Sequence, residues 1–330
     1  MNHNTADENL PWIEKYRPTN LDEVYGQTET VQTVRKFAQE GRIPHLLFYG
    51  PPGSGKTSTI IALARELYGK NYRNMVLELN ASDDRGINVV RDQIKNFAST
   101  RQIFSSGFKL IILDEADAMT NTAQNALRRV IEKYTKNTRF CILANYAHKL
   151  NPALLSRCTR FRFSPLSTKA IEERVAVVVK KENLKLSHDA KAGLLKLSEG
   201  DMRKALNVLQ ACTAALDSKD DEITVEMVYE CVGAPSPRSI EVVLDSIIKN
   251  DWSNAYSTMT KIRKTEGLAL IDLLSGFVEI LERYELKPKT RMDILEGLGD
   301  IEYGISKGGS ERIQSTAVIG CIKSALEHEA

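Results

Sequence analysis

A glycine-rich segment near the start of the chain could bind the phosphates of a nucleotide. Residues 50–57, GPPGSGKT, satisfy every position of the pattern GxxxxGK[ST]. Glycines let the backbone curve so that its N–H groups point at phosphate oxygens. In this pattern Lys56 reaches the outer phosphates and the Thr57 hydroxyl helps to hold Mg²⁺. The predicted phosphate-binding residues are Gly50, Pro51, Pro52, Gly53, Ser54, Gly55, Lys56, Thr57 and Ser58.

A second segment supplies the carboxylates that ATP hydrolysis needs. The apolar run 110–113 ends in Asp114 and Glu115. Asp114 would hold Mg²⁺, directly or through water, and Glu115 would orient or deprotonate the attacking water. Apolar strands often end in acidic residues, so the pair alone is a weak signal. Its place about sixty residues after a complete phosphate-binding loop makes it a strong one.

Alternating strands and helices must position these two segments. An apolar run precedes the glycine loop and a helical pattern follows it, which argues against a chance glycine turn. Further short apolar runs alternate with helical stretches and end in polar residues; the runs are 45–49, 75–80, 109–115 and 139–145. This alternation predicts an α/β domain with a mostly parallel sheet covered on both faces. Ligands bind such sheets at the carboxyl ends of the strands.

The strand pattern stops after residue 167, and the rest of the chain reads as helical. Four helices are expected at 168–183, 188–199, 201–216 and 224–231. The segment GAPSPRS at 233–239 reads as a linker before a further helical region. We therefore expect an α/β domain over 1–165, a small helical domain over 166–233 and a C-terminal helical domain over 234–330.

Composition adds limits rather than a function. The net charge of the 330-residue chain is only +2, so a DNA-binding surface would have to arise from local clustering of charge. The five cysteines are odd in number and none is spaced as CxxC, which favours buried reduced thiols over a zinc site or a disulfide framework. The first ten residues are polar and no apolar run reaches about 18 residues, so we expect an intracellular protein with no membrane partner.

A series of longer motifs identifies a family. The sequence resembles the AAA+ ATPases and, among them, the small subunits of replication factor C, over nearly its whole length. The motifs are WIEKYRP (12–18), VYGQ (24–27), GPPGSGKTS (50–58), LELNASDDRGI (77–87), LIILDEADAMT (110–120), AQNALRRVIE (123–132), LANY (143–146), LLSRCTRFRF (154–163) and GDMRKALNVLQ (200–210). The resemblance implies an AAA+ ATPase domain, a helical lid and a C-terminal helical collar that joins subunits.

The resemblance also implies roles around the nucleotide. Asn145 would sense the terminal phosphate and help to place the water. Arg203 would contact the same phosphate and couple lid closure to ATP, a role that suits the multidentate guanidinium. The residues implied on the adenine and ribose side are Ile13, Arg17 and Tyr25.

One implied residue acts outside its own subunit. By resemblance, Arg157 of the SRC sequence at 156–158 points into the ATP site of a neighbouring subunit and stabilises transition-state charge there. A surface ion pair is the structural alternative. If the family interpretation holds, the isolated chain should hydrolyse ATP poorly.

Two further surfaces are expected to meet macromolecules. By resemblance, Arg85, Arg91 and Lys95 would follow the DNA backbone without reading sequence, and the alternative is an ordinary solvated helix face. Ile103 and Phe104 form an apolar patch in a polar stretch; by resemblance they would contact the sliding clamp, or else they lie in the core of their own domain.

The resemblance, taken with the nucleotide motifs, implies a subunit of a hetero-pentameric clamp loader that uses ATP and Mg²⁺ to load a PCNA-type sliding clamp onto primer–template DNA. Its partners would be four related subunits, one large and three small, and it would lie in the nucleus. Three alternatives stay open. One is an AAA+ ring helicase or branch-migration motor, and one is a structural ATP-binding subunit with little turnover. The third is an archaeal, cytoplasmic loader built on one repeated subunit.

Overall fold

The computed structural model describes residues 10–82, 87–99, 107–216, 218, 221–282 and 284–327; for 87–91 it describes the backbone alone. The chain divides into two compact units. The first comprises Met1–Lys185 with Leu194–Gln210, and the second comprises Leu186–Gly193 with Ala211–Ala330. The two units divide the predicted second domain between them, so the boundaries expected near 165 and 233 stay predictions.

A five-stranded sheet forms the centre of the first unit, in the order β2-β3-β4-β1-β5. Every neighbouring pair is parallel, which confirms the predicted α/β fold. The strands are β1 (Leu46–Tyr49), β2 (Val76–Asn80), β3 (Lys109–Asp114), β4 (Thr138–Ala144) and β5 (Thr159–Arg162).

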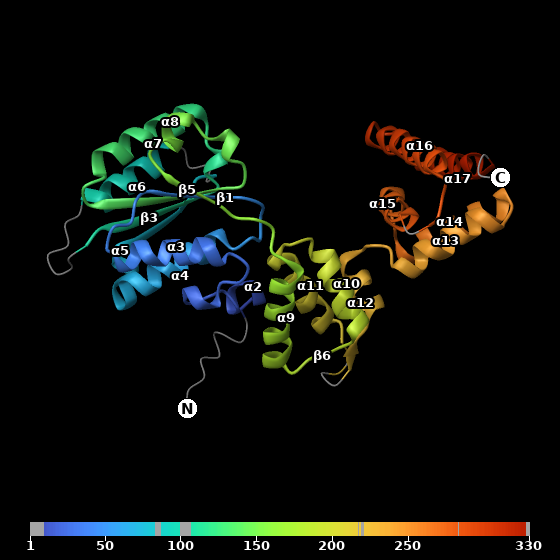
Figure 1. Ribbon diagram of the computed structural model, residues 1–330, viewed down its shortest axis with the longest axis horizontal. Helices are drawn as coiled ribbons and strands as arrows, with labels where there is room; N and C mark the ends of the chain where they lie inside the picture. Colours follow the sequence, from blue (N-terminus) through green and yellow to red (C-terminus); the bar gives the residue numbers. More distant parts are fainter. Residues whose placement is uncertain are drawn as a thin grey trace. The chain divides into compact units, whose positions relative to one another are not determined.

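Helices cover both faces of this sheet (Figure 1). On one face lie α3 (Thr28–Gln39), α4 (Lys56–Tyr68) and α5 (Tyr72–Met75), and on the other lie α6 (Ile87–Ser99), α7 (Asn121–Tyr134) and α8 (Pro152–Leu155). Side chains alternate along β1 as the pleat requires. Leu46 and Phe48 enter the core with α3 and α4, whereas Leu47 enters the core with α7. Short helices complete this part: α2 (Trp12–Lys15), η1 (Leu21–Glu23), η2 (Gly69–Asn71), η3 (Ala116–Ala118) and η4 (Ala147–Lys149).

The region after the sheet is mainly helical, with one exception. Four helices occur as expected: α9 (Thr168–Glu182), α10 (His188–Ser198), α11 (Met202–Ala214) and α12 (Val225–Val232). The expectation that no strand follows residue 167 is wrong, because β6 (Lys185–Leu186) and β7 (Glu222–Ile223) form a two-stranded sheet. At two residues each, these strands are too short for an alternating pattern to appear in the sequence.

Five helices pack around a single core at the C-terminal end of the chain. They are α13 (Pro237–Lys249), α14 (Trp252–Glu266), α15 (Leu270–Leu281), α16 (Pro288–Ser306) and α17 (Glu311–Glu327). Phe277, Leu244 and Val318 are fully buried in this core. Within the described ranges, no helix is both long enough and apolar enough to cross a membrane.

Candidate nucleotide-binding site

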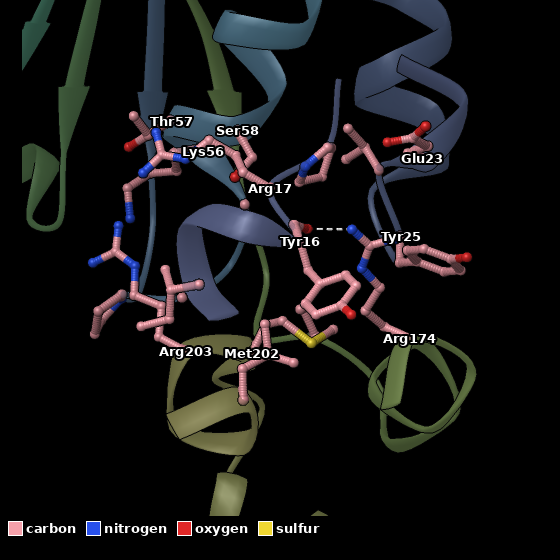
Figure 2. A pocket seen from close by; sticks show the side chains of 18 of the residues that line it. Tyr16, Arg17, Glu23, Tyr25, Lys56, Thr57, Ser58, Arg174, Met202 and Arg203 are labelled. Carbon is pink, nitrogen blue, oxygen red and sulfur yellow. Dashed lines mark hydrogen bonds between the residues drawn. The ribbon is translucent and has the colours of Figure 1, made fainter. Parts of the chain in front are cut away.

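A pocket lies where β1, β3 and β4 end, and it brings together segments far apart in the sequence (Figure 2). Most of the predicted nucleotide residues line it: Ile13, Arg17, Tyr25, Pro52, Gly53, Gly55, Lys56, Thr57, Ser58, Asp114, Glu115, Asn145 and Arg203. The remaining lining residues, which the sequence did not single out, are Tyr16, Pro18, Glu23, Val24, Leu166, Arg174, Met202 and Leu206.

Two glycines of the loop are required by its close neighbours. Gly50 has φ +148°, and a Cβ there would lie 2.0 Å from the carbonyl oxygen of Phe163. Gly53 has φ +65°, and a Cβ there would lie 1.7 Å from Oδ1 of Asp201. The Gly50 contact is with backbone, which cannot move aside, so this position requires glycine; at Gly53 the left-handed φ and the close carboxylate both favour glycine.

Lys56 is buried at the start of α4, and its ammonium group contacts three oxygen atoms. Nζ donates to the carbonyls of Gly50 and Pro51 at 2.8 Å each, and to Oδ1 of Asn145 at 3.0 Å. Burial lowers the pKa of Lys56 to about 8, against the opposing effect of the Asp114 carboxylate. The lysine and the predicted phosphate sensor are thus in direct contact.

The two residues predicted to hold Mg²⁺ lie side by side. Oγ1 of Thr57 donates to Oδ2 of Asp114 at 3.0 Å, and the N–H of Glu115 donates to Oδ1 at 2.8 Å. A hydroxyl and a carboxylate are hard oxygen ligands of the kind that Mg²⁺ prefers. Glu115 adopts a left-handed backbone (φ 55°), and its side chain is exposed at the pocket. The residues present therefore fit a nucleotide with its Mg²⁺.

Asp117, which is not among the predicted site residues, holds the backbone at Asn145. Its carboxylate accepts from the N–H of Asn145 at 3.3 Å and from the N–H of Tyr146 at 3.2 Å. These bonds connect the segment after β3 to the end of β4. The available signal was a third acidic residue just after the Asp114-Glu115 pair.

Asp201 organises the start of α11, which carries Arg203. Oδ1 accepts from the N–H of Arg203 at 2.7 Å and from the N–H of Lys204 at 3.4 Å, as an N-cap residue does. The N–H of Met202, the residue directly after Asp201, donates to the Gly53 carbonyl at 3.4 Å. The helix that presents Arg203 therefore begins against the phosphate-binding loop. An aspartate just before a helical pattern is a cap signal that the sequence contained.

Part of the pocket lining is apolar and aromatic. Leu166, Met202 and Leu206 line it beside Ile13 and Tyr25, which gives a surface suited to a base. Arg17, also predicted here, forms an ion pair with Glu14.

Arg157 does not line the pocket of its own chain. It is exposed, forms an ion pair with Glu132 of α7 and donates to the Ala153 carbonyl at 2.5 Å. The structure thus places it in a surface ion pair, which is compatible with the alternative as well as with a role toward a neighbour.

Most of the predicted DNA and clamp residues fall outside the part that can be described. Lys95 lies on α6, where Nζ is 3.4 Å from Oδ1 of Asp92. Arg91 belongs to the same helix, but its side chain is outside the described residues, as are Arg85, Ile103 and Phe104. The DNA assignment of Lys95 and these four assignments all remain predictions.

Two family models match the chain. Residues 46–166 match the ATPase family associated with various cellular activities (AAA). Residues 235–321 match the replication factor C C-terminal domain. The first match contains the phosphate-binding loop and the two carboxylates, and the second contains α13 to α16 and most of α17.

Curated relatives cover nearly the full chain. It is 68% identical to replication factor C subunit 3 of Saccharomyces cerevisiae, over 98% of this chain and 96% of that protein. It is 49% identical to replication factor C subunit 5 of Homo sapiens, over 97% and 93% respectively. Among solved structures, the Thermotoga maritima RuvB Holliday junction branch migration motor superposes with a TM-score of 0.53 at 16% identity, over 83% of this chain and 93% of that one. That last similarity concerns the fold alone.

Proposed function

The chain belongs to the replication factor C family, and on this premise we propose that it is one small subunit of a hetero-pentameric, nuclear clamp loader. With one large and three other small subunits, it would use ATP and Mg²⁺ to load a PCNA-type sliding clamp onto primer–template DNA. The observation that carries this proposal is the pocket at the ends of β1, β3 and β4, where Lys56, Thr57, Asp114 and Asn145 are in contact.

Each residue of the pocket has a part in Mg²⁺-dependent hydrolysis of the terminal phosphoanhydride. Lys56 would bind the outer phosphates, and Thr57 with Asp114 would hold Mg²⁺, which supplies charge stabilisation. Glu115 would orient the attacking water, and Asn145 would place it relative to the terminal phosphate. Such catalysis consists of positioning and electrostatic stabilisation rather than covalent chemistry.

Two different observations support the proposed roles of the helical lid and of the C-terminal collar. Arg203 enters the pocket from α11, which begins against the phosphate-binding loop. A nucleotide bound by Arg203 and by the loop would therefore connect the lid to the ATPase domain. On the C-terminal helices, large apolar side chains remain exposed, as surfaces that join subunits require. These side chains are Val242, Ile248, Trp252, Ile271, Val278, Met292, Leu295, Tyr303 and Ile313.

Co-purification tests this function most directly. A tagged copy, recovered from its own cells, should carry four different AAA+ relatives, one of them much larger. The recovered complex should place a sliding clamp on primed DNA only when ATP and Mg²⁺ are present. A homo-oligomer with no larger relative would contradict the proposal and favour a motor or an archaeal-type assembly.

Lys56→Ala should weaken ATP binding by about tenfold or more, because it removes a charge-assisted contact to the phosphates.

ATP binding to the unaltered chain should also depend on pH, because burial lowers the pKa of Lys56 to about 8. As pH rises through 8, the free chain loses the ammonium charge, so ATP affinity should fall and binding should take up protons. Calorimetry in buffers of different ionisation enthalpy would measure this uptake, which Lys56→Ala should abolish. Equal uptake in both chains would assign the proton to another group.

A further inference from the structure

One buried arginine of the pocket has no part in the chemistry described above. Arg174 lies on α9, is only 7% exposed and lines the pocket. In Figure 2 its side chain extends between Tyr16 and Tyr25, whereas Arg203 lies on the other side of Met202. The two arginines therefore face different parts of the site.

Arg174 contacts Tyr16 and Tyr25, which together form one wall of the pocket. Nη2 donates to the backbone carbonyl of Tyr16, and the guanidinium centre lies 5.7 Å from the centroid of the Tyr25 ring. No aspartate or glutamate of the described part of the chain forms an ion pair with it. Burying a cation is costly unless its surroundings compensate it. Here the compensation comes from a carbonyl dipole and an aromatic face, so the stabilisation of Arg174 depends on the position of that wall.

The same helix holds Tyr16 at a second point. Glu182, at the end of α9, accepts from the Tyr16 hydroxyl and pairs with Nζ of Lys15 at 2.5 Å. Arg174 and Glu182 are two helical turns apart, about 12 Å along the axis. Tyr16 is thus held at its backbone by one residue and at its hydroxyl by the other. Because a helix of this kind is stiff, the segment before Arg17 has little freedom to shift relative to α9.

We propose that Arg174 is a positioning residue for the adenine and ribose end of the nucleotide site. It fixes the Tyr16 backbone and the Tyr25 ring, so that the wall against which the base packs is formed before ATP enters. A preformed wall avoids the cost of ordering these side chains during binding. The phosphate end is held independently by the loop at residues 50–57. The inference therefore deepens the proposed nucleotide site and rests on it.

Arg174→Gln should separate the two ends of the site. We expect its Kd for ATP to rise roughly tenfold, the size of a lost cation–π contact together with a charged hydrogen bond. Its Kd for inorganic triphosphate should stay unchanged, because that ligand has no base. Titration calorimetry on the full chain with Mg²⁺ measures both constants. Arg174→Lys keeps the charge, but lysine cannot both donate to the Tyr16 carbonyl and stack on the Tyr25 ring. Its Kd for ATP should therefore lie between those of the unaltered chain and of Arg174→Gln.

Arg139 provides a matched control. Its Nε donates to the Ile43 carbonyl at 2.7 Å, and its guanidinium lies 5.3 Å from the Phe108 ring. As at Arg174, the guanidinium bonds a backbone carbonyl and faces an aromatic ring, although Arg139 also donates to the carbonyls of Thr135 and Thr138 and is half-buried. Arg139 is near the start of β4, whereas the pocket lies at the strand's other end. Arg139→Gln should lower the melting temperature and leave both dissociation constants unchanged.

The outcomes separate this inference from the function on which it rests. If the unaltered chain binds neither ligand, the nucleotide site itself is wrong, and the inference fails with it. If the unaltered chain binds ATP and Arg174→Gln binds it equally well, only the inference fails. A parallel loss of ATP and triphosphate would show a general structural role and would also overturn it. A Tyr25→Leu variant adds a second check. In the double variant, its effect on the Kd for ATP should not add to that of Arg174→Gln, because both substitutions disturb the same wall.

Discussion

Glu115→Gln should bind ATP as tightly as the unaltered chain and lose about 100-fold or more of its turnover. Glutamine keeps the size and the hydrogen-bonding reach of glutamate but cannot accept a proton from water. The change leaves Asp114 in place, since the bond to Oδ1 of Asp114 comes from the backbone N–H of residue 115. It also leaves the Thr57–Asp114 contact intact. Binding and turnover should therefore separate.

The measurement requires a complex in which the other active subunits carry the equivalent glutamine, so that only this site contributes. Turnover in the presence of clamp and primed DNA is then compared with equilibrium ATP binding. Glu40→Gln, at the end of α3 and away from the pocket, is a suitable control. Equal turnover in both variants would favour the structural ATP-binding subunit, the alternative that the sequence left open.

The parts of the site that the sequence predicted are those specified by continuous motifs. The path of the phosphate-binding loop depends on glycines within a few residues of Lys56, and β3 is an unbroken apolar run that ends in Asp114 and Glu115. The topology then follows, because alternating strands and helices place these ends at one edge of a parallel sheet. Local information was sufficient here, since each element carries its own pattern.

The residues that the sequence missed act across long separations. Asp117 bonds the backbone 28 residues away, and Arg174 bonds the Tyr16 carbonyl 158 residues away. Both side chains would be ordinary on a solvated helix or loop, and only the fold gives them partners. Asp117 left only the weak signal of a third acidic residue after the Asp114-Glu115 pair, and Arg174 left no signal in the sequence. The same holds for β6 and β7, whose pairing depends on segments more than 30 residues apart.

Arg157→Ala should leave ATP binding at its own site unchanged and reduce hydrolysis at a neighbouring subunit's site by roughly 10³-fold or more, the usual effect of removing an arginine finger. Arg157 is absent from its own pocket and exposed beside Glu132. An exposed ion pair contributes little to stability, so the variant should fold and assemble normally. Single-site turnover in the five-subunit complex is the measurement.

The decisive comparison places Glu115→Gln and Arg157→Ala in the same chain. If Arg157 acts in trans, the two substitutions disable different sites, and the complex should lose the activity of both. If Arg157 acts on its own site, the second substitution should add little to the first, since residues that act as a unit are strongly non-additive. Glu132→Gln is the control, because it releases the arginine without removing it. Loss of turnover in Glu132→Gln equal to that in Arg157→Ala would mean that the ion pair, rather than a free guanidinium, is what the neighbouring site requires.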